Sequence, residues 1–192
     1  WLKLSTNLNF NQTDEKLGST SENVINTALN MSPSIAVKNP NGTWGGADDI
    51  NGSSVQFTPL NPIAIANLIE NTLKRYNFLG GFNADVTLFK GLIFRTSING
   101  NYSTSDGRNF TPTYQLGNKV NGTASLSLNN SSSFNWNWNK LLQYNTEIGK
   151  LEIGVMVGHE SHSCSYKGMS GSRTCFLSNE VVELPLGGEL GQ

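Results

Sequence analysis

Charged residues are scarce in this chain, and no long run of apolar residues takes their place. The 192 residues include 13 Lys and Arg and 14 Asp and Glu, so that 14% of the chain is charged and the net charge is -1; an average soluble domain has roughly 25% charged residues. This balance argues against a nucleic-acid-binding protein. Because no stretch approaches the roughly 18 consecutive apolar residues of a transmembrane helix, the sequence excludes helical membrane spanning but leaves spanning by β-strands open.

Cysteine is also scarce, with only Cys164 and Cys175 in the chain. Their spacing suits one disulfide that closes a loop, and it does not suit a disulfide framework.

Asn, Ser, Thr and Gly replace the missing charges, beside 36% hydrophobic and 9% aromatic residues. This composition fits poorly with the highly charged type of disorder, so we expect an ordered chain.

Alternation of apolar and polar residues is the main pattern that is present. It runs through residues 2–11, through 74–102 on both sides of a turn at 89–91, and through 134–157 on both sides of a turn at 148–150. The pattern predicts one strand and two similar hairpins, with strands long enough to cross a membrane. In residues 74–88, Asn83, Asp85 and Thr87 mark the wet side.

The predicted connections between strands are of two very different lengths. The two turns are tiny, whereas residues 11–72, residues 103–133 and the segment after His159 are long, polar and rich in Gly and Pro. Structureless connections beyond roughly 12–15 residues are uncommon in compact sheets, but outer-membrane barrels pair short periplasmic turns with long extracellular loops. We therefore predict an all-β fold, an antiparallel segment of a transmembrane β-barrel.

Short helices are expected inside the first long loop, over residues 22–30 and 61–69, the second with Pro62 at its first turn. Residues 123–128 alternate briefly and are interpreted as a strand extension or a ribbon within a loop. The five or six predicted strands are fewer than the eight of the smallest outer-membrane barrels, and an open arc would leave unpaired edges in lipid. We expect residues 1–192 to be part of a single, larger barrel domain.

Several stretches of the chain resemble stretches of one protein family, and they follow one another in the order found in that family. They are residues 28–37, 39–44, 61–64, 79–97, 154–160 and 166–179. Together they resemble the first long loop and the barrel of SusC/RagA-type TonB-dependent transporters of the Bacteroidetes outer membrane.

In that family a plug domain sits inside a 22-stranded barrel, a TonB box receives energy from the inner membrane, and a SusD-like lipoprotein closes the extracellular mouth. The resemblance implies that this chain is a middle part of the barrel, without plug domain or TonB box, located in the cell outer membrane. It implies nutrient import, and we expect no enzyme activity, cofactor or metal site in this chain. The implied partners are a SusD-like surface lipoprotein, the TonB complex through regions absent from this chain, a glycan or peptide substrate, and outer-membrane lipid.

The first long loop holds the candidate contacts for substrate or lid protein, namely Trp44, Asp48 and Asp49. Trp44 lies among Gly42, Gly45 and Gly46, and an anchor that packs the loop is an equal alternative. The two aspartates lack the spacing and closing Glu of a calcium loop, so a solvated turn is the simpler interpretation.

Two other clusters are better explained by structure than by chemistry. His159 and His162 lack the His-Glu-x-x-His spacing that places two ligands on one helix face, so we interpret them, with Cys164, as a strand end entering a loop and not as a metal site. Ser170 only superficially resembles a nucleophile elbow, and no base accompanies it.

Trp136 and Trp138 lie on one face of a predicted strand. A lipid-facing aromatic girdle is the favoured interpretation because the same face continues into Leu142 and Tyr144. The alternative is a platform for sugar rings. It belongs to a second hypothesis, a soluble or surface-displayed β-sandwich that binds glycans through these residues and Trp44.

Overall fold

The structure is a computed structural model that describes residues 1–18, 24–46, 60–180 and 182–190. The fold is mostly β, with two short α-helices. The elements in chain order are β1 (Leu2–Lys16), α1 (Val24–Asn30), α2 (Pro62–Leu68), β2 (Glu70–Phe89), β3 (Leu92–Thr111), β4 (Tyr114–Leu116), β5 (Lys119–Asn121), β6 (Ser125–Ile148), β7 (Leu151–Thr174), the 3-10 helix η1 (Leu184–Leu186) and β8 (Glu189–Leu190).

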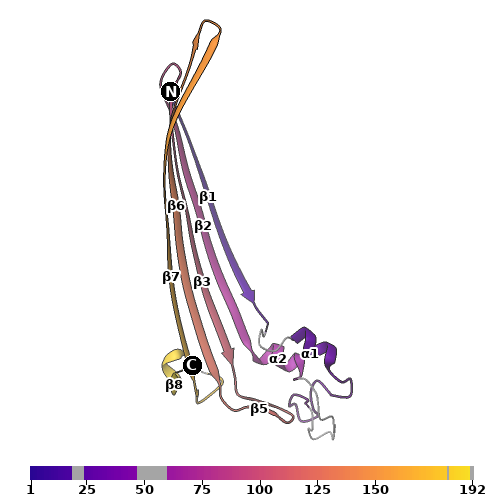
Figure 1. The fold of residues 1–192 in the computed structure, drawn as a ribbon. Helices are drawn as coiled ribbons and strands as arrows, with labels where there is room; N and C mark the ends of the chain where they lie inside the picture. The colour runs from indigo at the N-terminus through magenta and orange to yellow at the C-terminus, as the bar shows by residue number, and fades with distance from the viewer. Residues whose placement is uncertain (19–23, 47–59, 181, 191–192) are drawn as a thin grey trace. The chain divides into compact units, whose positions relative to one another are not determined.

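Five long strands form one antiparallel sheet, which the short β8 extends in the order β1-β2-β3-β6-β7-β8 (Figure 1). β8 pairs with the end of β7 through Arg173 and Thr174, while β4 and β5 form a separate two-stranded ribbon. The sheet is open, and the described residues form no closed barrel. The predicted antiparallel β fold is therefore confirmed at the level of the sheet.

Both predicted turns are present, at Lys90-Gly91 and at Gly149-Lys150. Gly91 has φ +89° and Gly149 has φ +66°, a region of backbone conformation that residues with a Cβ rarely adopt. The sequence predicts both turns correctly because glycine is the residue that such turns require.

The strands continue farther than the apolar alternation predicts. β3 reaches Thr111, β6 begins at Ser125 and β7 reaches Thr174, so the loop boundaries expected at 103, 133 and 159 are wrong, whereas the strand extension near 123–128 is confirmed. Neighbouring strands are joined beyond the apolar stretches by polar side chains: the hydroxyls of Ser105 and Ser131 are 2.8 Å apart. Because the ladder is built from backbone groups, such polar segments extend a strand without an apolar period.

The chain divides into two compact units. The strand unit consists of Trp1–Thr13, Arg75–Ser105 and Ser131–Gly168. The loop unit consists of Asp14–Lys74, Asp106–Asn130 and Met169–Gln192. The strand unit contains both tight turns, and the loop unit contains the helices, the β4–β5 ribbon and two small hydrophobic cores.

The first core of the loop unit forms around α2, where Ala64, Ile65, Ile69 and Leu116 are buried. Asn61 caps this helix by accepting hydrogen bonds at Oδ1 from the backbone N–H groups of Ile63 and Ala64, as an N-cap residue does. α2 confirms the helix predicted over residues 61–69, and α1 confirms the one predicted over residues 22–30 within the described residues.

The second core joins strands to the C-terminal segment. Phe110, Ala124, Leu126 and Phe176 are buried together, and Leu128, Val182 and Leu184 pack against them. The rings of Phe110 and Phe176 meet edge to face, with centroids 6.4 Å apart. This packing holds the chain after β7 against the sheet residues of the loop unit.

Candidate functional site

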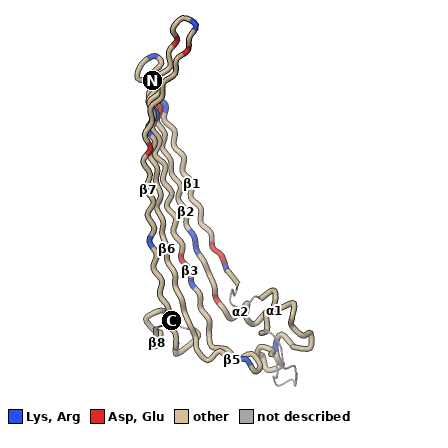
Figure 2. Tube along the Cα trace, viewed as in Figure 1, with Lys and Arg blue, Asp and Glu red and all other residues tan. Residues whose placement is uncertain are grey.

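The strand unit has one sheet face that is apolar and exposed. Apolar residues recur at every second position, and contacts between strands place them on the same face: a Cβ at Gly80 would lie 3.3 Å from Leu8 Cδ2, and Trp138 Nε1 donates a 2.8 Å hydrogen bond to Thr96 Oγ1. Exposed members of this apolar face are Leu4, Leu8, Phe10, Phe78, Phe82, Leu88, Ile98, Tyr102, Phe134, Trp138, Leu142, Tyr144, Ile148, Leu151, Ile153, Val155 and Val157. Charges are sparse along these strands (Figure 2).

The opposite face of the strand unit is polar. Arg95 Nε lies 3.7 Å from Asp85 Oδ2, so one of the predicted wet-side residues belongs to an ion pair. The carboxamides of Asn7 and Asn99 converge over Gly81, where a Cβ would lie 2.3 and 2.5 Å from their Oδ1 atoms. The glycine therefore leaves room for polar side chains from the two adjacent strands.

A small cavity of about 200 Å³ in the strand unit is lined by Leu79, Gly100 and Trp136 together with four asparagines and a histidine. Its lining includes Asn99, Asn101, Asn135, Asn137 and His162. Asn135 Oδ1 is buried there without a hydrogen-bond partner in the structure. The cavity therefore holds an unpaired carboxamide oxygen among asparagines and apolar residues.

Trp138 combines a ring on the apolar face with polar contacts at its edge and above its plane. Besides the hydrogen bond from its indole to Thr96, the ring has Lys140 Nζ 3.4 Å from its centroid, within cation–π distance. Such amphipathic tryptophans are typical of the membrane–water interface. Lys140 therefore covers one side of the ring, and the girdle and the sugar platform both stay predictions.

Of the predicted loop contacts, only Trp44 lies within the described residues; Asp48 and Asp49 lie outside them. Trp44 packs against the buried cluster around Ile65 and Leu116, and Lys38 Nζ lies 4.7 Å from its ring centroid. This packing supports the role of a loop anchor, and contact of Trp44 with a substrate or lid protein stays a prediction.

The two cysteines do not form the expected loop disulfide: both are free and exposed. Cys164 lies inside β7, and the strand continues from it to Thr174, directly before Cys175. An extended strand rises about 3.3 Å per residue, whereas a disulfide requires Cα atoms about 4.4–6.8 Å apart. The expectation was wrong because this segment is strand and not loop.

His159, His162 and Ser170 also lie within β7. In the part of the chain that the structure describes, no group of three or more potential ligands is placed to hold a metal ion.

None of the described helices is long and apolar enough to cross a membrane.

A pocket of about 460 Å³ in the loop unit was missed by sequence analysis. It is lined by residues of β2, β3, β6 and β7 and by Leu184 of η1, namely Thr72, Lys74, Asp106, Gly107, Arg108, Leu128, Asn129, Asn130, Met169, Ser170, Gly171 and Leu184. These residues lie mostly in segments that were predicted as loops. Only the placement of polar residues within continuous strands brings them together.

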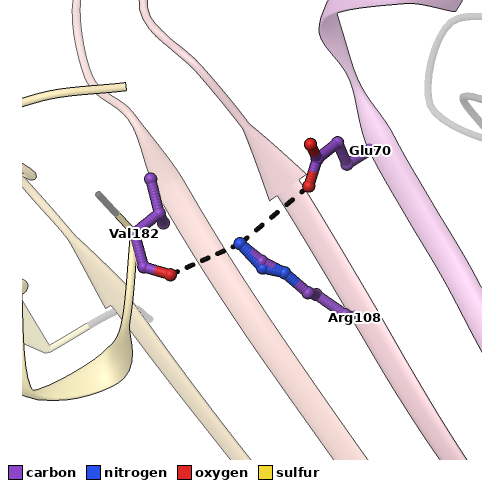
Figure 3. Close-up of polar contacts among 3 residues, drawn as sticks. All are labelled: Glu70, Arg108 and Val182. Carbon is purple, nitrogen blue, oxygen red and sulfur yellow. Dashed lines mark hydrogen bonds and ion pairs between the residues drawn. The ribbon is translucent and has the colours of Figure 1, made fainter. Parts of the chain in front are cut away.

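Arg108 of this pocket contacts both Glu70 and Val182 (Figure 3). Its Nη2 lies 3.9 Å from Glu70 Oε2 and donates a 3.3 Å hydrogen bond to the carbonyl of Val182. Asn130 donates to Asp106 on the neighbouring strand. The pocket thus combines a polar, charged part with the apolar side chains of Leu128, Met169 and Leu184.

Comparison with known proteins assigns no family to the chain. No protein-family model matches it, and no curated protein matches it significantly.

Proposed function

We propose that this chain forms part of the barrel wall of an energised outer-membrane nutrient importer of the SusC/RagA type. The observation that carries the proposal is the apolar face of the strand unit, which is exposed on five neighbouring strands, opposite a polar face. Monomeric soluble proteins rarely expose apolar patches larger than a few hundred Å². A barrel wall in lipid requires such a face outside and a polar face inside.

The sheet edges support a wall that further strands complete. β1 is an edge strand of the described sheet, and β7 has only the two-residue β8 beyond it. Unpaired strand edges are costly in lipid because no water satisfies the backbone groups. The proposal therefore requires additional strands on both sides of these five.

The connections fit the same proposal. β2–β3 and β6–β7 are joined by two-residue turns, whereas β1–β2 and β3–β6 are joined by long segments that hold α1, α2 and the β4–β5 ribbon. In an antiparallel barrel these two kinds of connection belong to opposite ends. The long segments would then be extracellular, where a glycan or peptide and a SusD-like lipoprotein bind; energy would come from the TonB complex through other regions.

Site-specific fluorescence quenching tests the proposal. With Cys164 and Cys175 changed to Ser, single Phe82→Cys and Asn83→Cys variants would carry an environment-sensitive fluorophore in outer-membrane vesicles. We expect lipids brominated on their acyl chains to quench the label at position 82 and aqueous iodide to quench the label at position 83. Ile98→Cys and Asn99→Cys provide a second pair with the same expected difference.

The opposite pattern, or equal quenching at both positions of each pair, would refute the membrane wall. The alternative glycan-binding β-sandwich buries its apolar face between two sheets, so it requires the label at position 82 to be protected from both quenchers. The exposure of this face in the structure gives the barrel wall the stronger support.

A further inference from the structure

The pocket of the loop unit has the size and composition of a ligand site. Its volume of about 460 Å³ falls within the range of roughly 300–1,000 Å³ that is typical of small-molecule sites. Such sites are mainly apolar, with a few polar groups that fix the orientation of the ligand. The apolar side chains here are Leu128, Met169 and Leu184, and the charged ones are Lys74, Asp106 and Arg108.

The apolar part of the pocket is held in place by the packing around it. Leu184 packs against the buried cluster of Phe110 and Leu126, and a Cβ at Gly171 would lie 3.3 Å from Leu184 Cδ1. Leu128 packs against the same cluster, whereas Met169 is largely exposed. An apolar ligand segment would cover Met169 and gain contact with the two leucines.

The charged part of the pocket can accept an anion. Arg108 and Glu70 are separated by 3.9 Å, with side chains 35% and 57% exposed, so this pair is a weak surface interaction. A phosphate next to Arg108 would accept hydrogen bonds from the guanidinium group, whose planar arrangement of donors suits phosphate. Lys74 lines the same pocket and adds a second positive charge; the carboxylate of Asp106, which accepts a hydrogen bond from Asn130, keeps its negative charge there, so the phosphate is placed on the side of Lys74 and Arg108.

We propose that this pocket binds a phospholipid, with an acyl chain against Leu128, Met169 and Leu184 and the phosphate at Lys74 and Arg108. A fatty acid supplies the chain without the phosphate, and a sugar phosphate supplies the phosphate without the chain. The combination of both chemistries in one pocket selects the phospholipid. The proposal rests on the proposed function in one respect, because a membrane location supplies the lipid.

Native mass spectrometry of the detergent-purified protein tests this assignment. The probes are dipalmitoyl phosphatidylethanolamine, palmitate and glycerol 3-phosphate, each titrated separately. We expect a one-to-one adduct with the phospholipid, and at least about tenfold weaker binding of either half alone, because each lacks one set of contacts. Palmitate or glycerol phosphate binding as tightly as the phospholipid would overturn the assignment.

Variants locate the lipid on the protein. Lys74→Ala and Leu128→Asn should each weaken the phospholipid adduct about tenfold, and Lys74→Arg should restore it because the charge returns. Lys167→Ala is the matched control, since this exposed lysine of β7 does not line the pocket. Equal adducts in the wild type and all variants would exclude the pocket as the site.

The failure of this proposal is distinguishable from failure of the membrane wall. Lipid binding in micelles reports on the pocket alone, whereas quenching at positions 82 and 83 reports on the strand unit. A protein with the expected quenching and no saturable phospholipid adduct would keep the wall and lose the lipid site.

Discussion

At the scale of single residues, Asn61 organises the first long loop. This residue is only 2% exposed. Oδ1 accepts from the N–H groups of Ile63 and Ala64 at 3.1 and 3.2 Å, and Nδ2 donates to the carbonyls of Val37 and Gly45 at 3.0 and 3.1 Å. One carboxamide therefore both starts α2 and ties it to the loop segment that contains Trp44.

We predict that Asn61→Ala destabilises this part of the loop unit by about 2–3 kcal/mol, because it removes an N-cap and leaves buried polar groups unsatisfied. Hydrogen exchange of the α2 amides would measure the local effect. Asn61→Asp keeps the cap acceptor but places a buried carboxylate oxygen against the carbonyls of Val37 and Gly45, so a loss at least as large is expected.

Asn67→Ala provides the control for this prediction. Asn67 is exposed and its Nδ2 donates to the carbonyl of Ile63 in the same helix, so its removal should change protection by no more than about 0.5 kcal/mol. Equal effects of Asn61→Ala and Asn67→Ala would contradict the bridging role of Asn61.

The role of Trp44 shows what the sequence could not determine at this scale. Its glycine-rich surroundings predicted a functional contact or a packing anchor equally well. The packing of its ring depends on Ile65 and Leu116, which are distant in sequence and whose packing no local pattern encodes. The N-cap of α2 was easier to predict because Asn61-Pro62 is a local signal.

At the scale of elements, the two tight turns differ in the space around their glycines. Gly149 has a positive φ, but nothing lies within 4 Å of a Cβ placed there. Gly91 has a positive φ and also lies against β6: a Cβ would be 2.3 Å from the carbonyl oxygen of Asn145. The Gly91 carbonyl accepts a 2.9 Å hydrogen bond from Asn145 N, so the β2–β3 turn is fixed to its neighbour strand.

We predict that Gly149→Ala costs about 1 kcal/mol through backbone strain alone, and that Gly91→Ala costs about 1–3 kcal/mol more because the backbone of β6 must shift. Urea unfolding in micelles, followed by tryptophan fluorescence, would give both values. A cost for Gly91→Ala no larger than that for Gly149→Ala would show that the contact with Asn145 has no energetic weight.

Strand positions and turns could be predicted from sequence, but strand lengths could not. The apolar period ends near Tyr102 and begins again near Phe134, and between these points the ladder is continued by pairs such as Ser105 with Ser131. Serine and asparagine are also common in loops, so these residues do not by themselves indicate a strand. Whether they form one depends on the partner strand.

At the scale of the whole molecule, the chemistry of the two sheet faces could be predicted and the pocket could not. The faces follow from a period of two along each strand, which the sequence displays directly. The pocket depends on the packing of Leu184 over strand residues such as Gly171, and this packing brings together segments distant in sequence. Arg108 therefore gave no signal as a site residue.

The last prediction uses two apolar side chains of β2 that are matched in exposure but lie on opposite faces. Phe82 is 46% exposed on the apolar face, and Leu79 is 45% exposed on the polar face. In lipid, Phe82→Arg should destabilise the folded state by about 2–4 kcal/mol if position 82 lies near the bilayer midplane, whereas Leu79→Arg in a polar lumen should cost much less. Urea titration of the protein in vesicles would measure the difference. Equal costs would mean that both faces contact the same solvent, and a barrel wall cannot have that property.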